Sequence, residues 1–81
     1  MPTAPPPDWV LAHRRVLGDC IRELRRERRI SQQKLAGMAG LERQAINRIE
    51  QGHQTPYMDT VIRIAAALDV ELRLAARGPD D

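Results

Sequence analysis

Five polar side chains between positions 42 and 48 have the chemistry needed to recognise DNA bases. In a helix predicted over residues 41–50 they share the exposed side, whereas Ile46 and Ile49 share the apolar side. Arginine can pair bidentately with guanine and glutamine with adenine, and the later residues can reach flanking bases or phosphates. The candidate base-reading residues are Glu42, Arg43, Gln44, Asn47 and Arg48.

Glu42 differs from the other four because its carboxylate would repel a nearby phosphate. A negative charge does suit the N-terminus of a helix. Two roles stay open: Glu42 accepts a hydrogen bond from a cytosine amine, or it only holds Arg43 in place.

Two short helices joined by a tight turn must position this polar face. Ser31 is an N-cap candidate for the first helix, and Gly40 suits the left-handed conformation at its end. Gly52 closes the second helix. A helix, a glycine turn and a second helix with a polar exposed side form the layout of a helix-turn-helix, here over residues 31–52. The apolar positions that face the core are Leu35, Ala36, Ala39, Leu41, Ile46 and Ile49.

Basic residues are concentrated in the part of the chain that contains this layout. The 81 residues carry a formal charge of +2. Residues 13–48 hold ten basic and four acidic side chains, a net of +6, whereas residues 49–81 hold three and six, a net of −3. A protein that neutralises phosphates needs such a basic region. Charge alone also allows solvated helix faces without a partner.

The composition limits the classes of function. The length allows one small domain with a thin core, so we expect a dimer. Cys20 is the only cysteine, which excludes a disulfide or a zinc cluster within the chain, and we expect it in the core. Without an apolar run for a signal peptide or membrane span, we expect a cytoplasmic protein with no membrane contact. No nucleophile is clustered with a base, so we expect no enzyme, no cofactor and no metal.

The remaining elements follow from proline, glycine and the apolar pattern. Residues 1–8 form a proline-rich arm expected to be disordered, the domain spans 9–76, and the tail 77–81 is expected to be frayed. Trp9 to Arg29 is helical, and Gly18 marks either a kink or the start of the first core helix. A fourth helix is predicted from Pro56, with Thr55 as its N-cap.

The spacing of apolar residues changes in the C-terminal part of the domain. Val70, Leu72 and Leu74 alternate with Glu71 and Arg73, which favours a strand. Because a lone strand is unstable, it would pair with the same strand of a second copy and so form the dimer. A fifth helix over residues 70–76 is the alternative.

Three segments together resemble the lambda-repressor-like helix-turn-helix domains, the XRE (Cro/C1-type) family. They are L-G-D-C-I-R-E-L-R-R-E-R-R-I-S-Q-Q-K-L-A at residues 17–36, A-I-N-R-I-E-Q-G at 45–52 and P-x-x-x-T-V-I-R-I-A-A-A-L-D-V at 56–70. The resemblance implies an all-α bundle of four or five helices that binds operator DNA as a dimer.

The resemblance also implies roles for residues outside the polar face. Glu50 matches a buried acid of the family, and Arg25 matches its partner on the first helix. The start of the second helix and the loop after the third correspond to phosphate contacts. The candidate phosphate-binding residues are Ser31, Gln32, Gln33, Lys34, His53 and Thr55.

Three functions are compatible with these features. The first is a transcriptional regulator, a repressor, whose homodimer binds a palindromic operator through the helix 41–50 in the major groove. The second is a DNA-binding antitoxin similar to those of HipB-like toxin–antitoxin modules, with a toxin as protein partner. The third is an interaction module that contacts protein and not DNA.

Overall fold

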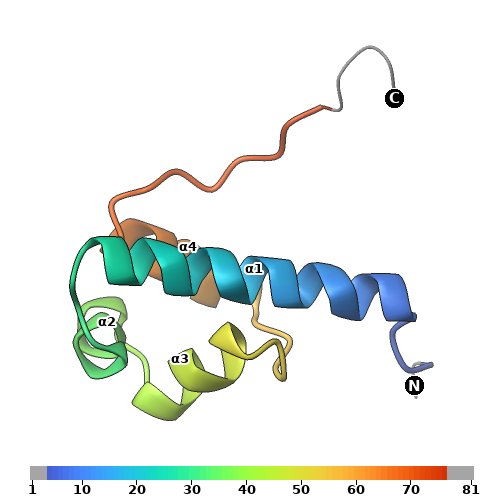
Figure 1. Ribbon diagram of the computed structural model, residues 1–81, viewed down its shortest axis with the longest axis horizontal. Coiled ribbons are helices and arrows are strands. Elements are labelled where there is room, and N and C mark those ends of the chain that lie inside the picture. Colours follow the sequence, from blue (N-terminus) through green and yellow to red (C-terminus); the bar gives the residue numbers. More distant parts are fainter. Residues whose placement is uncertain (1–3, 77–81) are drawn as a thin grey trace.

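Four helices make up the computed structural model, which describes residues 4–76. Figure 1 shows α1 running across the full width of the molecule, with α2 and α3 on one side of it and α4 behind it. Helix α2 packs against α3 and α4, and α1 packs against α3. This arrangement confirms the predicted all-α bundle. The helices are α1 Asp8–Glu27, α2 Gln32–Ala39, α3 Arg43–Glu50 and α4 Met58–Ala67.

The turn between α2 and α3 has the expected chemistry. The Ser31 hydroxyl accepts a hydrogen bond from the Lys34 backbone N–H at 3.0 Å, which satisfies one of the free donors at the start of α2. Gly40 ends α2 with a φ of 70°, in the left-handed region that favours glycine. The Leu41 N–H then donates to the Ala36 carbonyl at 2.8 Å. The chain therefore leaves α2 in one fixed direction, and that direction sets where α3 begins.

The core is aliphatic and lies between the four helices. Leu35 and Ile46 are completely buried, so α2 and α3 each contribute one central side chain. Cys20, which we expected in the core, is exposed on α1. Cys20 lies at the edge of the apolar face of that helix, where hydrophobic periodicity does not distinguish buried positions from exposed ones. The buried core residues are Ile21, Leu35, Ala36, Ala39, Ile46, Ile49, Ile64 and Leu68.

Helix α1 runs without a break from Asp8 to Glu27 and is straight in Figure 1, so Gly18 marks neither a boundary nor a kink. Gly18 is buried, and a Cβ built on it would lie 2.4 Å from the carbonyl oxygen of Ile49 and 2.7 Å from that of Glu50. Such distances are far inside van der Waals contact. Glycine is therefore needed here because the C-terminal end of α3 rests directly on the backbone of α1.

The C-terminal part of the chain differs from the sequence-based expectations. Helix α4 begins at Met58, and its N-cap residue is Tyr57. The expected start at Pro56 with Thr55 as N-cap is therefore wrong. Residues 70–76 are neither strand nor helix in the single chain, and Leu74 is fully exposed there. A strand needs a hydrogen-bonded neighbour, and one copy offers none to this segment. Residues 4–7 carry no helix, while positions 1–3 of the expected arm and the expected tail 77–81 lie outside the described residues.

Within residues 4–76, no helix is both long enough and apolar enough to cross a membrane.

One buried carboxylate joins three helices. Glu50 is 1 % exposed, and Arg25 of α1 donates to its two oxygens from Nε at 2.7 Å and from Nη2 at 3.0 Å. From the start of α2, Gln32 Nε2 donates to Glu50 Oε1 at 3.1 Å. Arg22, one turn before Arg25, donates from Nη2 to the Glu50 carbonyl oxygen at 3.0 Å. The Arg25–Glu50 contact is the pair that the family resemblance implies, and Arg22 adds a second cation to it.

This network determines the charge state of Glu50. Burial alone would raise the pKa of the carboxyl, but the hydrogen bonds from Arg25 and Gln32, together with the charges of Arg25 and Arg22, hold that pKa below its ordinary value. The hydrogen bond to Glu50 in turn raises the pKa of Arg25. Both partners are therefore ionised at neutral pH.

Gly18→Ala should lower the free energy of unfolding by about 1–3 kcal/mol, because the added methyl group forces α1 and α3 apart. Gly37→Ala is the matched control, since a Cβ at that exposed helical position meets nothing within 4 Å. We expect this control to gain up to about 1 kcal/mol from helix propensity. Urea unfolding measures the free energy of unfolding of both variants. Equal effects of the two substitutions would contradict the close approach at Gly18.

Glu50→Gln should destabilise the fold by about 3–5 kcal/mol, since it leaves the partly buried Arg25 without a counter-charge. The stabilisation from Glu50 is present above the ordinary glutamate pKa of about 4.3. It is lost as the pH falls through the lower pKa of the folded chain. From neutral to acid pH, the thermal unfolding temperature should therefore fall less steeply for Glu50→Gln than for the parent chain. Glu23→Gln, at an exposed position of α1, should retain the parent profile.

Candidate nucleic-acid interface

The structure separates the two sides of α3. Ile46, Ile49 and Glu50 are buried against the rest of the domain. Asn47 is half-buried between the two sides. The remaining base-reading candidates are all exposed, namely Glu42, Arg43, Gln44 and Arg48. One short helix thus has a buried side that fixes its position and a polar side that is free to meet a ligand.

Glu42 lies at the N-cap of α3, and its side chain makes no capping hydrogen bond. Of the ion pairs formed within residues 4–76, none joins Glu42 to Arg43. In the free chain Glu42 therefore does not hold Arg43 in place. The other role, accepting a hydrogen bond from a cytosine amine, stays a prediction.

Gln32 lies at the first position of α2, where its amide is used inside the protein. Its Nε2 donates to Asn47 Oδ1 at 3.2 Å and to Glu50 Oε1 at 3.1 Å. Both amide hydrogens are thereby occupied. The groups left at this end of α2 for a phosphate are the backbone N–H groups of Gln32 and Gln33, which have no intrahelical carbonyl partner.

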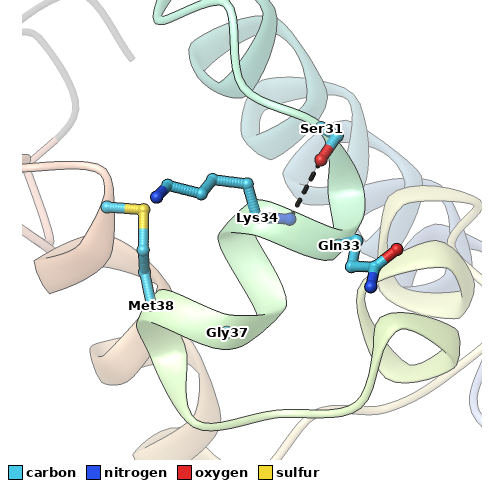
Figure 2. Close-up of a pocket in the computed structure, with 5 residues that line it drawn as sticks. All are labelled: Ser31, Gln33, Lys34, Gly37 and Met38. Atoms are coloured by element: carbon cyan, nitrogen blue, oxygen red, sulfur yellow. Dashed lines mark hydrogen bonds between the residues drawn. The ribbon is translucent and has the colours of Figure 1, made fainter.

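Side chains on the first turn of α2 point to different sides of that helix. Figure 2 shows Lys34 running along α2 toward Met38, with Gln33 on the opposite side. Gln33 lines two open hollows, one with Glu42 and Arg43 and one with Lys34 and Met38, whereas Lys34 lines only the second of these two. Gln33 therefore lies beside the start of α3, and Lys34 lies farther around the helix. Lys34 would reach a phosphate only at the edge of the surface.

The loop after α3 extends the polar surface toward the N-terminal half of α1. His53 and Thr55 are exposed, and the His53 backbone N–H donates to the Arg48 carbonyl at 2.9 Å. Gly52 has a φ of 76°, and a Cβ built on it would lie 2.7 Å from Cγ of Arg15. This contact places the exposed Arg15 beside the loop, which the sequence did not reveal. The signal in the sequence was Gly52, because a glycine can mark a positive φ or the close approach of another segment.

The electrostatics favour an anionic ligand. Arg22 and Arg25 are occupied by Glu50, whereas Arg43 and Arg48 make no ion pair within residues 4–76. In that same range no three His, Cys, Asp or Glu side chains come together to hold a metal ion. The polar surface consists of exposed arginines and amides on one helix, next to the N-terminus of another. It can donate hydrogen bonds to phosphates and to base edges.

Comparisons with known proteins agree with this arrangement. A family model described as helix-turn-helix matches residues 21–74. A crystal structure of the restriction-modification controller protein C.AhdI from Aeromonas hydrophila is 33 % identical in sequence. It aligns with a TM-score of 0.73 over 74 % of this chain and 91 % of that one. No curated protein gives a significant match. The chain is therefore a non-enzymatic DNA-binding transcriptional regulator that belongs to the XRE-type helix-turn-helix family.

Proposed function

We propose that this regulator is a repressor whose homodimer binds a palindromic operator, each copy placing α3 in the major groove of one half-site. The observation that carries the proposal is the division of α3 into a buried side and an exposed side. The exposed Arg43 and Gln44 stand in its first turn, the part of a recognition helix that contacts base edges. Beyond this face and a dimer contact, repression would need no further surface, because a bound dimer would exclude polymerase from an overlapping promoter.

The phosphate contacts would surround this reading helix. The candidates are the backbone at Gln32 and Gln33, the loop at His53 and Thr55, and Arg15 from α1. They lie at both ends of α3 and would fix its register on the duplex without reading sequence. Since these contacts release counterions, binding should weaken steeply as salt is raised.

The dimer would form through the C-terminal segment. Residues 70–76 lack regular structure in the single chain, and Leu72 and Leu74 are 47 % and 104 % exposed. An apolar groove, open to solvent, adjoins this segment between α1 and α4. Its lining includes Leu17, Cys20, Leu24, Val61, Val70 and Leu72. The same segment of a second copy would supply the strand partner and cover these apolar side chains.

An antitoxin is the second candidate, and the apolar groove favours it because a toxin could bind there. We prefer the stand-alone regulator because C.AhdI is described as a controller protein and this chain covers 91 % of it. Co-expression with the neighbouring gene, followed by mass analysis of the purified complex, separates the two. A stoichiometric protein partner would favour the antitoxin.

Arg43→Ala should reduce binding to the preferred operator by about 5- to 150-fold, the equivalent of roughly 1–3 kcal/mol for a lost bidentate contact. Binding to random DNA should change much less. Arg63→Ala removes the same charge from an exposed position on α4 and is the matched control. Gel-shift titration at fixed salt measures all three proteins. Operator binding by Arg43→Ala equal to that of the control would contradict the assignment of the reading face.

Leu72→Asp combined with Leu74→Asp should convert the dimer to a monomer, because two charges would enter the apolar interface. The fold should survive, since neither side chain is buried in the single chain. Arg73→Gln, on the alternate side of the segment, should remain dimeric. Analytical ultracentrifugation gives the mass. A double variant that stays dimeric would place the interface elsewhere.

A further inference from the structure

We propose that Gln32 is a positioning residue for DNA reading: it fixes the amide of Asn47 so that Asn47 offers Nδ2 as a donor to an acceptor on one base edge. The inference rests on the proposed role of α3 in the major groove. It adds a specific chemistry to Asn47 and a dependence of base choice on side chains that do not contact DNA.

The first step concerns the orientation of the Gln32 amide. Glu50 is ionised and can only accept hydrogen bonds. The atom of Gln32 that lies 3.1 Å from Glu50 Oε1 must therefore be the nitrogen, Nε2. The alternative orientation would place two oxygens against each other in a buried site. The charge of Glu50 thus leaves Gln32 one orientation.

The second step concerns the Asn47 amide, whose orientation is determined by that of Gln32. Gln32 Nε2 carries two hydrogens, and the second points to Asn47 at 3.2 Å. The Asn47 atom that receives it must be an acceptor, which is Oδ1. Because Oδ1 is held toward α2 and the core, Nδ2 is the end of the amide directed away from them. Without Gln32, either end of the amide could face the ligand.

The third step is the consequence for base choice. Asn47 follows Arg43 by one helical turn, on the same side of α3. In the major groove guanine presents N7 and O6, adenine N7 and thymine O4 as acceptors, whereas cytosine presents a donor. An outward Nδ2 can bond the first three and has no acceptor on cytosine. We therefore expect discrimination against cytosine at the base that Asn47 meets.

The experiment selects bound fragments from random duplex DNA with the full chain, Asn47→Ala, Gln32→Met and the double variant. Asn47→Ala should identify one position per half-site where cytosine becomes acceptable. At that position Gln32→Met should reduce the discrimination against cytosine by roughly 3- to 10-fold, the worth of one hydrogen bond. Positions that respond to Arg43→Ala should keep their preference, and the double variant should lose no more than Asn47→Ala.

Asn47→Asp tests the same idea without altering Gln32. The carboxylate still accepts from Gln32, but its outward oxygen can only accept, so the preference at that position should change from guanine and thymine to the bases that present a donor, cytosine and adenine. The rank order of bases is the readout, because the added negative charge weakens binding to any sequence.

The outcomes separate the inference from the proposed function. An unaltered base profile in Gln32→Met, or an unchanged rank order in Asn47→Asp, would overturn the role of Gln32 while sequence-specific binding stands. A parent chain that selects no sequence at all would overturn the proposed function as well.

Discussion

The orientation of α3 depends on one buried carboxylate. Glu50 receives hydrogen bonds from Arg25 on α1 and from Gln32 on α2, and Arg22 bonds the backbone of the same residue. Aliphatic contacts among the helices hold α3 in the core, but the hydrophobic effect behind them has no preferred direction. Charged hydrogen bonds are directional, and a buried charge that loses them is costly. The network therefore fixes one orientation of α3 relative to α1 and α2.

The network requires a short distance between α1 and α3, and Gly18 makes that distance possible. The carbonyl oxygens of Ile49 and Glu50 lie where a side chain at position 18 would begin. With the backbones this close, Arg22 reaches the Glu50 carbonyl at 3.0 Å and caps the end of α3. An alanine-sized spacer would separate the helices and lengthen every contact from α1. Packing and electrostatics thus act at the same point of the bundle.

Features defined by neighbouring residues could be predicted from the sequence, whereas most contacts between distant residues could not. The periodicity and the glycine turn predicted α2 and α3, because both helices are defined by neighbouring residues. Gly18 is uninterpretable without knowing that the end of α3 rests on it. Arg22 looked like any other arginine of α1, since its target is a backbone carbonyl 28 positions away. The C-terminal segment has an alternating pattern but no regular structure in the single chain, because a strand needs a hydrogen-bonded neighbour.

Helix α3 has eight residues, too few for a stable helix in isolation. Its shape and direction are imposed by the surrounding domain, and so is the direction of every side chain on its exposed face. Asn47 shows the coupling directly, because its amide is held by Gln32, which is held by Glu50. Under the proposed role of α3, side chains that do not touch the duplex therefore belong to the reading surface in an energetic sense. Under the same proposal, a substitution in the core would change which bases are preferred while leaving the exposed residues untouched.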